Sequence, residues 1–593
     1  MTEQTHLIGK DATLETSIAR MEQQLAQAGF DIAFAKAHCP VDGIFWLHIK
    51  DRHCPALFTN GKGASRKATQ ASALGEFLER LQTGYFFSDY FLTLHQDAAG
   101  EQAWLYHPNE THLSLSAYRR ALTPELWRFY DPEGIWEAED FLSLNDHEQR
   151  VVCLPFQALS SGQTVDFPAN LLSNLYASNG LSAGNTVAEA QTQALSEILE
   201  RWVKKCILTQ NLCLPEVPDT VLARLPNVAH ALERLKAHHL QVSVRDASLG
   251  GRFPVVNVTL FDPQSGRCFA SFGAHPLFEV ALERTVTEAL QGRSLDHLDG
   301  FDVPIFDAEW VGSDENIENH FIDGSGWVHA RFIGDQADFA FYDWHHQPLP
   351  GLEAVETTQQ QKAGLVHLIE SQLQATVYAT EDGYLGTPAC RVVVPGVSEV
   401  LPLTEMVDNN QNQGRRLREA LCDLVLEQGQ LNPASGHLFL ETLEALGFAD
   451  HQGVASLIGL LPDPDSVWQT LKIIDLKVFV YLGCQEFPEA LDALEEAEMF
   501  LNDPQLAHFY RALKFGLQAR MQPELGVDTH QTQARLFGSS HALWVREHLD
   551  GQVFMLGLPV GLAAFTQSSR HQSLLETQRR LRVFQNKASI YQA

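Results

Sequence analysis

The chain has 593 residues, of which 45% are hydrophobic and 20% are charged, as expected of a folded globular protein. At about 100–200 residues per domain, this length predicts roughly three to five structural units. The net charge is −32, from 42 basic and 74 acidic residues, and such a balance repels nucleic acid and anionic membrane surfaces at long range. Nucleic acid is therefore not expected as the main ligand, although one small anion can still bind in a locally basic pocket.

The sequence also argues against secretion and membrane insertion. The first residues, MTEQTHLIGKDATLE, contain no apolar segment of the kind found in signal peptides. The most apolar late stretch, from Val553 to Phe565, is shorter than the about 20 residues that span a bilayer. The nine cysteines are scattered and form no CxxC pair, unlike the ligands of zinc and iron–sulfur sites. We therefore expect reduced cysteines and a cytoplasmic location.

Helical and strand patterns alternate over the first two thirds of the chain. Apolar residues at helical spacing predict helices over 13–28, from the Gly61-Lys62-Gly63 turn to about 85, over 186–206 and over 276–293. Asn185 or Thr186 is a fair N-cap for the third of these. Residues 44–49 form a short apolar run, and the patterns over 241–246, 253–261, 268–273 and 390–394 predict strands. The mixture predicts an α+β fold.

Strand patterns nearly vanish after about Pro402. Helical patterns separated by turns follow, for example over 414–428, 466–482 and 489–501. The segment from Glu486 to Ala497 resembles the second helix of a tetratricopeptide repeat, whereas the helix before it fits that repeat poorly. We therefore predict an α-helical, tetratricopeptide-like C-terminal domain over 406–593.

The most informative feature is a motif that occurs twice. ALGEFLERL at 73–81 matches ALSEILERW at 194–202, and ALERTVTEAL at 281–290 is a looser relative. In a helix, residues three apart share one face, so each copy presents a pair of glutamates on one side. These pairs are Glu76 with Glu79 and Glu197 with Glu200.

The second copy has a third carboxylate on the same stripe. Glu189 precedes Glu197 by eight residues and Glu200 by eleven, offsets of roughly 80° and 20° around a helix. Like charges on one face repel each other, and Arg80 and Arg201 offset them only in part. A hard divalent cation would offset them, and magnesium suits a few carboxylates combined with substrate phosphates.

The repeated motif favours a magnesium site over two other interpretations. A single E-x-x-E-R segment would ordinarily be a solvated helix face, but two matched copies in apolar surroundings favour a site. A di-iron bundle would require Glu-x-x-His, which neither copy has. The Gly61-Lys62-Gly63-Ala64-Ser65 and Ser182-Ala183-Gly184-Asn185 segments each open a helix whose N–H groups could meet phosphate. The Walker A pattern and the G-x-S-x-G elbow are both absent from the sequence.

Taken together, these motifs resemble a known family. The segments 61–80, 182–201 and 272–293 are similar to the three ATP-binding stretches of the YcaO family. The FTNGKGAS, SNGLSAGNT and FGAHP runs and the opening Gly9-Lys10-Asp11 resemble its stand-alone bacterial subgroup, described as accessory factors for methylthiolation of a small-subunit ribosomal protein. The resemblance implies a YcaO-type ATP-binding core of mixed sheets and long helices over 61–405, with 1–60 as its N-terminal part.

The resemblance also implies site residues, carried over by position. Magnesium is expected at the carboxylates of Glu76, Glu79, Glu189, Glu197, Glu200 and Glu288. ATP is expected to contact Lys10, Ser17, Ser72, Ser182, Asn185, Arg201 and Arg284. Of these residues, Glu79, Arg201 and Arg284 are expected to take part in catalysis.

In family members of known chemistry, ATP phosphorylates a backbone amide oxygen during or after attack by a nucleophile, and the products are azolines, thioamides or amidines. This chemistry needs positioning and positive charge around phosphate more than a covalent catalyst. Azoline-forming members end in a PxPxP tail, but this chain ends Lys587–Ala593 without proline, which argues against azoline formation. The missing cluster cysteines exclude the radical methylthiotransferase itself, so a role beside it would be auxiliary.

We therefore predict a magnesium-dependent, ATP-hydrolysing enzyme that activates a backbone amide and serves β-methylthiolation of a small-subunit ribosomal protein. The expected partners are a peptide or protein substrate and a radical methylthiotransferase or ribosomal protein, and the family implies a homodimer. The alternative is an ATP-binding scaffold whose helical C-terminal domain recruits a partner. A metal protein without a nucleotide is a third, minor possibility.

Overall fold

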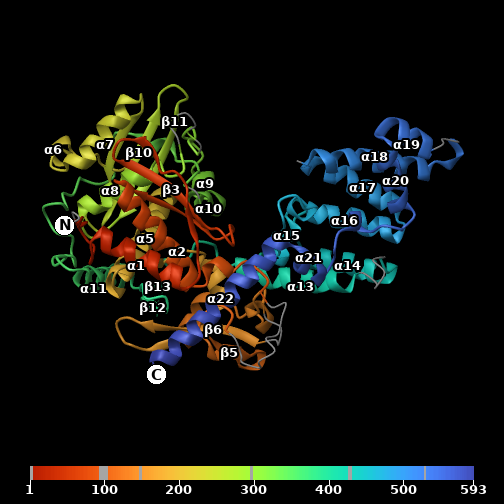
Figure 1. The fold of residues 1–593 in the computed structure, drawn as a ribbon. Helices are drawn as coiled ribbons and strands as arrows, with labels where there is room; N and C mark the ends of the chain where they lie inside the picture. Colours follow the sequence, from red (N-terminus) through yellow and green to blue (C-terminus); the bar gives the residue numbers. More distant parts are fainter. Residues whose placement is uncertain are drawn as a thin grey trace.

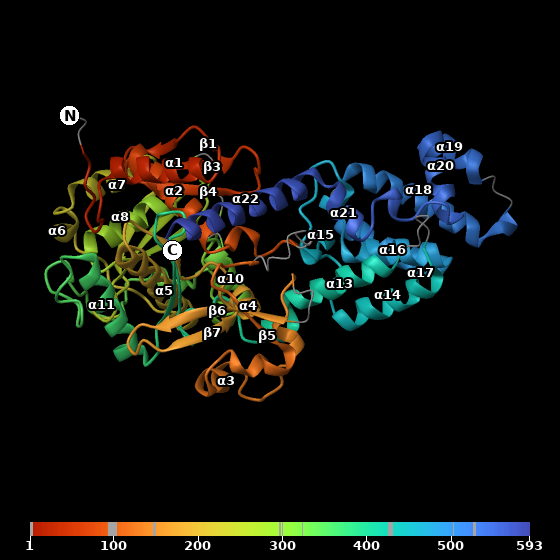
Figure 2. The ribbon, with the colours of Figure 1, turned by 60° about the horizontal axis from the view of Figure 1, so that its bottom comes forward.

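The computed structural model describes residues 4–92, 104–145, 150–293, 295, 298, 300–322, 324–424, 431–501, 503–525 and 529–592. Two parts follow each other in space (Figure 1): an α+β core, as predicted, coloured red to green, and a row of cyan and blue helices that extends from it. Figure 2 shows the last helix running back beside the core. Among the residues described, no helix is both long and apolar enough to cross a bilayer.

A first antiparallel sheet and two helices come from the N-terminal residues. The strands are β1 (Ile32–Phe34), β2 (His38–Val41), β3 (Ile44–Asp51) and β4 (Phe58–Gly63), and β3 pairs with the other three. Helix α2 (Arg66–Gln82) packs on β3 and β4, and α1 (Leu14–Gln27) packs on α2. Both helices begin where a side chain caps them: Thr13 accepts from the Thr16 N–H and Ser65 from the Ala68 N–H.

A second sheet lies at the centre of the largest hydrophobic core. Its strands are β9 (Gln241–Asp246), β10 (Val255–Asp262) and β11 (Arg267–Ala274), with β10 in the middle. Helices α5 (Val187–Thr209) and α8 (Phe278–Glu288) pack on this sheet, which explains why β10 is buried almost throughout. The strands expected over 241–246, 253–261 and 268–273 are thus confirmed to within two residues at either end.

A third antiparallel sheet joins distant parts of the chain. Its strands are β5 (Thr111–Ser114), β6 (Arg150–Ala158), β7 (Thr164–Pro168), β8 (Leu181–Ala183), β12 (Tyr378–Asp382) and β13 (Ala389–Val393). β8 pairs with β13, so the start of α5 is held by a strand some two hundred residues later. The other core helices are α3 (Pro124–Tyr130), α4 (Ala169–Tyr176), α6 (Asp219–Leu222), α7 (Pro226–Ala237), α9 (Ala308–Val311), α10 (Asp314–Ile322) and α11 (Thr358–Leu368).

Helices α2, α5 and α8 each follow a strand in the chain. At or just after the end of that strand, one glycine lies directly against the helix. A Cβ at this glycine would overlap the helix: Gly61 with Thr69 O at 2.2 Å, Gly184 with Ala190 N at 2.6 Å, and Gly273 with Thr285 Oγ1 at 2.3 Å. The expectation of a turn at Gly61-Lys62-Gly63 is therefore wrong, because these residues end β4. Their glycines serve the close approach of strand and helix.

Gly61→Ala is expected to lower the free energy of unfolding by about 1–3 kcal/mol, because the added methyl overlaps backbone that moves only with α2. Gly75→Ala is the matched control in α2, where a Cβ meets nothing within 4 Å. It should raise stability by about 0.5–1 kcal/mol through helix propensity. Urea unfolding followed by circular dichroism measures both changes, and equal stability of the two variants would contradict the close packing.

After β13, all of the elements in the described part of the chain are helices. These helices are α12 (Glu405–Asp408), α13 (Gln411–Asp423), α14 (Pro433–Leu446), α15 (Val454–Ile458), α16 (Ile473–Cys484), α17 (Phe487–Ala497), α18 (Pro504–Met521), α19 (Thr529–Phe537), α20 (Ser539–Leu549), α21 (Leu562–Gln567) and α22 (Ser569–Gln592). The expected α-helical character is confirmed, and the tetratricopeptide likeness stays a prediction. The helix expected over 466–482 begins later, at Ile473, and part of the one expected over 414–428 lies outside the described residues.

The last helix returns to the first sheet. Leu574 and Leu581 of α22 are fully buried in a cluster with Leu25 of α1 and Phe77 of α2. His571 Nε2 also lies 2.8 Å from the Phe91 carbonyl oxygen. The domain boundary at 405 stays a prediction, and packing makes α22 part of the core cluster.

Candidate functional site

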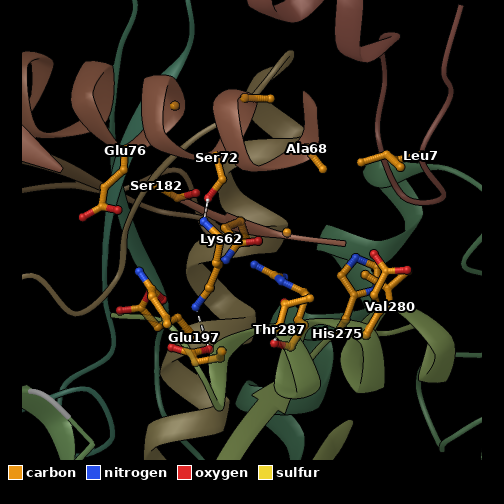
Figure 3. A pocket seen from close by; sticks show the side chains of 18 of the residues that line it. Leu7, Lys62, Ala68, Ser72, Glu76, Ser182, Glu197, His275, Val280 and Thr287 are labelled. Carbon is orange, nitrogen blue, oxygen red and sulfur yellow. Dashed lines mark hydrogen bonds and ion pairs between the residues drawn. The ribbon is translucent and has the colours of Figure 1, made fainter. Parts of the chain in front are cut away.

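A cleft with a volume of 1340 Å³ lies where α2, α5 and α8 converge (Figure 3). The N-terminal segment and the end of α10 complete its walls. Every residue that the sequence assigned to ATP or magnesium lines this cleft, namely Lys10, Ser17, Ser72, Glu76, Glu79, Ser182, Asn185, Glu189, Glu197, Glu200, Arg201, Arg284 and Glu288. The structure thus brings the three helices to one site, and the individual roles stay predictions.

The two copies of the motif adopt the same local geometry. Arg80 Nη2 lies 3.3 Å from Glu76 Oε1, and Arg201 Nη2 lies 3.3 Å from Glu197 Oε1. Each pair spans one helical turn, as the shared spacing of the motif predicts. Arg80 Nε also lies 3.5 Å from Glu79 Oε1. Each arginine therefore offsets part of the negative charge of its own helix.

In α8 the glutamate forms its ion pair with a residue outside its own helix, unlike Glu76 in α2 and Glu197 in α5. Glu288 could have formed an ordinary one-turn ion pair with Arg284, but its Oε2 lies 2.6 Å from Lys62 Nζ of β4. Figure 3 shows Lys62 extending into the middle of the cleft from below Ser72. No carboxylate among the described residues lies within the 4.0 Å of an ion pair from Arg284. Arg284 therefore keeps its guanidinium available for an anionic ligand.

In the free protein, burial disfavours the ionised form of the carboxylates of Glu79 and Glu200. Burial raises the pKa of Glu79 to about 8, and Glu76 and Glu197 add to this rise against the opposing Arg80. Burial, followed by the charge of Glu288, raises the pKa of Glu200 to about 8. Burial would also raise the pKa of Glu288, but Lys62, helped by Arg284 and Lys204, more than reverses this, and the pKa of Glu288 is lowered. A divalent cation would favour the ionised form of all of these groups.

The carboxylates fit magnesium only in combination with other ligands. Within the part of the chain that the structure describes, no three His, Cys, Asp or Glu side chains are grouped closely enough to hold a metal ion. Magnesium commonly takes one or two protein carboxylates and completes its shell with phosphate oxygens and water. The donor set therefore fits magnesium that arrives with a nucleotide rather than a metal held by protein alone.

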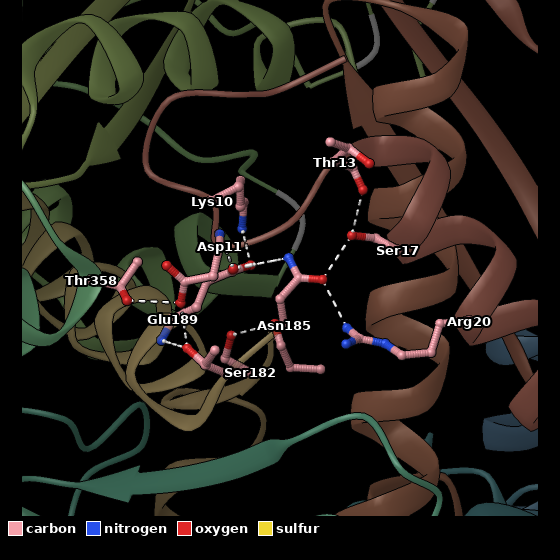
Figure 4. Close-up of polar contacts among 11 residues, drawn as sticks. Lys10, Asp11, Thr13, Ser17, Arg20, Ser182, Asn185, Glu189 and Thr358 are labelled. Carbon is pink, nitrogen blue, oxygen red and sulfur yellow. Dashed lines mark hydrogen bonds and ion pairs between the residues drawn. The ribbon is translucent and has the colours of Figure 1, made fainter. Parts of the chain in front are cut away.

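Glu189 lies in a separate polar network at the start of α5 (Figure 4). Its carboxylate accepts from Lys10 Nζ at 3.1 Å and from the Asp11 N–H at 2.9 Å. Asn185 Nδ2 donates to the same carboxylate at 2.9 Å. Burial would raise the pKa of Glu189, but Lys10 and the Asp11 N–H outweigh it, and the pKa is lowered. Protein donors therefore surround this carboxylate, unlike those of Glu79 and Glu200.

Asn185 connects this network to α1. Its Oδ1 lies 2.7 Å from Ser17 Oγ and accepts from Arg20 Nη2 at 2.8 Å. Thr186, not Asn185, is the N-cap of α5, because its side chain accepts from the Glu189 N–H. Asn185 is thereby left to join the N-terminal segment to the cleft.

The two remaining serines lie on the cleft wall. Ser72 Oγ accepts from the Lys62 N–H at 3.3 Å, so this N–H already has a partner within the protein. Ser182 lies in β8 and is 1% exposed, with Oγ 3.5 Å from the Ala183 carbonyl oxygen. Both hydroxyls line the cleft, and Figure 3 shows them on either side of the upper end of Lys62.

The polar residues of the cleft that sequence reasoning missed include Lys62, Lys204 and His275. Burial, with help from Arg284 and Lys10, lowers the pKa of His275 well below its usual value, so its imidazole is neutral. His275 Nδ1 accepts from the Leu277 N–H, which leaves the proton on Nε2. Lys204 could have been found, since it follows Glu200 by one helical turn. The Lys62 side chain was missed because its segment was interpreted as a turn that offers backbone N–H groups to phosphate.

Comparison with known proteins identifies the family. A family model described as YcaO cyclodehydratase, ATP- and Mg2+-binding, matches residues 60–398. A second, described as YcaO cyclodehydratase C-terminal domain, matches residues 414–587. The chain belongs to the YcaO family. This confirms the family expected from the motifs, and the family description confirms ATP and magnesium as the cofactors.

Individual relatives extend the comparison over the whole chain. The Escherichia coli (strain K12) protein named Ribosomal protein S12 methylthiotransferase accessory factor YcaO is 38% identical over 588 residues, 98% of each chain. A solved heterocyclase in complex with substrate and cofactor is 16% identical, with a TM-score of 0.45 over 67% of this chain and 54% of that one. YcaO from Methanopyrus kandleri bound with AMPPCP and Mg2+ is 17% identical, with a TM-score of 0.38 over 68% and 96%.

Proposed function

We propose that this YcaO family member binds magnesium and ATP in the cleft and uses ATP to activate a backbone amide by phosphorylation. The observation that carries the proposal is the convergence of α2, α5 and α8, which brings paired carboxylates and arginines to one site. The raised pKa values of Glu79 and Glu200 support it, because a cation and a polyphosphate together would balance these charges. Membership of an ATP- and Mg2+-binding family supports it as well.

The proposed roles follow from the position of each group. Glu76, Glu79, Glu197, Glu200 and Glu288 would hold magnesium, and Glu189 would do so only after exchanging protein donors. These carboxylates would hold magnesium together with the nucleotide, and the metal would supply positive charge against that of the leaving group. Arg201 and Arg284 would hold phosphate oxygens, since a guanidinium can donate two parallel hydrogen bonds. Lys10, Ser17, Ser72, Ser182 and Asn185 would fix the rest of the nucleotide.

The proposed physiological role is that of an accessory factor in β-methylthiolation of a small-subunit ribosomal protein, in the cytoplasm and as a homodimer. The accessory role is supported by the 38% identity, over 98% of both chains, to the Escherichia coli protein named Ribosomal protein S12 methylthiotransferase accessory factor YcaO. The acceptor would be a peptide amide of a ribosomal protein, with a radical methylthiotransferase as partner. The row of helices from α13 to α20 favours a second candidate, in which the nucleotide serves a scaffold that recruits the partner.

Isothermal titration of the folded protein with a non-hydrolysable ATP analogue, with and without magnesium, tests the binding that the proposal requires. We expect saturable binding that depends on magnesium, and slow ATP hydrolysis that accelerates with the true acceptor. Absence of analogue binding in protein shown to be folded would falsify the proposal. Binding that is unchanged when magnesium is removed would contradict the metal role of the carboxylates.

Magnesium-dependent binding of the analogue is expected to release protons and to tighten as pH rises from about 6 to 8. In the free protein, Glu79 and Glu200 have pKa values of about 8 and hold protons at neutral pH. A bound cation favours the ionised form, so each carboxylate that binds it loses its proton, and affinity rises up to about tenfold per pH unit for each proton released. Titrations in two buffers of different ionisation enthalpy count these protons.

The Glu79→Gln variant is the control for proton release, because glutamine cannot titrate. It should release fewer protons than the wild type at pH 7. The same linkage predicts that the free protein loses stability as pH rises toward 8, since the folded state holds protons that the unfolded chain has already lost. An affinity that is independent of pH between 6 and 8 would contradict the raised pKa values.

A further inference from the structure

Lys204 is a buried cation on the wall of the cleft that the functions assigned above do not use. It lies on α5 one turn beyond Glu200 and is 7% exposed. Its Nζ donates to the His320 carbonyl oxygen at 2.9 Å, which uses one of its three N–H donors. Within the described part of the chain, no carboxylate comes within the 4.0 Å of an ion pair with this amine. Buried lysines are normally paired, so this one has capacity for a ligand.

The other cations of the triphosphate region are mostly engaged with glutamates. Lys62 is bonded to Glu288 at 2.6 Å, and Arg201 to Glu197 at 3.3 Å. Lys204 feels the charges of Glu200 and Glu288 without forming an ion pair with either. If Glu200 and Glu288 bind magnesium, the metal offsets their negative charge and so their attraction for Lys204. The phosphate then becomes the anion that the Lys204 amine can bind. Its amine would then gain a partner in the loaded cleft that it lacks in the free protein.

Lys204 also marks the border with a second part of the cleft. The His320 carbonyl that it binds belongs to the end of α10, where Phe321 and Ile322 line the cleft. Phe321 packs against the Arg201 guanidinium, with 5.5 Å from Cζ to the ring centroid, and the Phe272 ring lies 5.6 Å from Lys204 Nζ. The cleft volume of 1340 Å³ exceeds the about 300–1,000 Å³ of ordinary small-ligand pockets. It has room for an acceptor beside the nucleotide, on this apolar side.

We propose that Lys204 is a catalytic residue that donates a hydrogen bond to the γ-phosphoryl group as it passes from ATP to the acceptor. The inference rests on the proposed function. In that step the acceptor amide oxygen forms a bond to the γ-phosphorus, the bond from phosphorus to the β–γ bridging oxygen breaks, and ADP carries away the electron pair. Negative charge is spread over the three equatorial oxygens, and Lys204 stabilises one of them while keeping its proton.

The test compares ground-state and transition-state mimics in Lys204→Met, which keeps the length of the side chain without its charge. In the presence of magnesium, the affinity for a non-hydrolysable ATP analogue should change less than about threefold. The affinity for ADP with aluminium fluoride, which mimics the transferring phosphoryl group, should fall about 100-fold, together with the rate of ATP hydrolysis. Lys204→Arg should recover part of both, because it restores a positive donor.

Lys205→Met is the matched control, since its side chain lies on the same helix and is not among the residues that line the cleft. It should leave all three quantities unchanged. Thermal unfolding of each variant shows whether it is folded, and Lys204→Arg and Lys204→Gln serve as readouts if Lys204→Met is not. Equal affinity of wild type and folded variants for ADP with aluminium fluoride would overturn the proposal, as would loss of analogue binding. Absence of analogue binding in the wild type would instead contradict the proposed function.

Discussion

Glu200→Gln is expected to lower the rate of ATP hydrolysis by about 100-fold or more and to weaken magnesium-dependent nucleotide binding. Glutamine has the same shape but cannot ionise, whereas Glu200 can give up its proton to a bound cation at a position where the fields of Glu288, Lys62 and Glu197 meet. A neutral amide is a weak ligand for magnesium, so the metal loses a carboxylate and the phosphates lose part of their anchor. Steady-state hydrolysis and calorimetric titration of the same preparation measure both effects.

Glu233→Gln is the control for the charge change, because Glu233 is an exposed residue of α7. It should hydrolyse ATP at the wild-type rate. A cellular experiment separates the two candidate functions: Glu200→Ala replaces the wild-type protein, and methylthiolation of the ribosomal protein is measured. Loss of ribosomal protein methylthiolation supports the enzyme. Full methylthiolation in cells whose purified variant has lost ATP turnover would instead support the scaffold.

Leu574→Ala and Leu581→Ala are each expected to lower the free energy of unfolding of the core by about 2–5 kcal/mol. Both side chains are fully buried, and they lie two turns apart on the face of α22 that packs against α1 and α2. Truncation leaves a cavity beneath helices that also carry Ser17, Glu76 and Glu79. Nucleotide affinity should therefore fall together with stability. Denaturant unfolding in the presence and absence of the analogue measures both.

Val583→Ala is the matched control on the same helix, because Val583 is 49% exposed. Its effect should stay within about 0.5 kcal/mol. If Leu581→Ala were as stable as the wild type, the last helix would not be docked on the core. Stable, nucleotide-binding protein after removal of residues 569–593 would contradict the docking in the same way.

Much of the site could be predicted from the sequence because its key signal is local. The repeated motif places Glu76 near Arg80 and Glu197 near Arg201 through helical periodicity alone, and the structure shows the same 3.3 Å pairing in both. The strands β9 to β11 were also predictable, since their apolar runs are bounded by turns. The identity of the ligands, ATP and magnesium, came from the resemblance to the YcaO family, because helical periodicity does not identify a ligand.

Several features depend on contacts between distant segments, which no local pattern encodes. The pairing of Lys62 with Glu288 joins β4 to α8, so neither sequence neighbourhood reveals it. Gly61 seemed to belong to a phosphate loop, because a glycine needed for close packing and one needed for a turn look alike in sequence. The strand β8 went unpredicted, since its partner β13 lies some two hundred residues later in the chain.

The sequence by itself determined the helices, the carboxylate pairs they carry and the family to which the chain belongs, because these depend on residue type at fixed spacing. Only the tertiary structure decided that α2, α5 and α8 face one cleft, and that α22 closes the core beneath two of the motif glutamates. It alone placed Lys204 against the end of α10. The reason is physical: periodicity fixes which face of a helix a residue occupies, and packing fixes what that face meets.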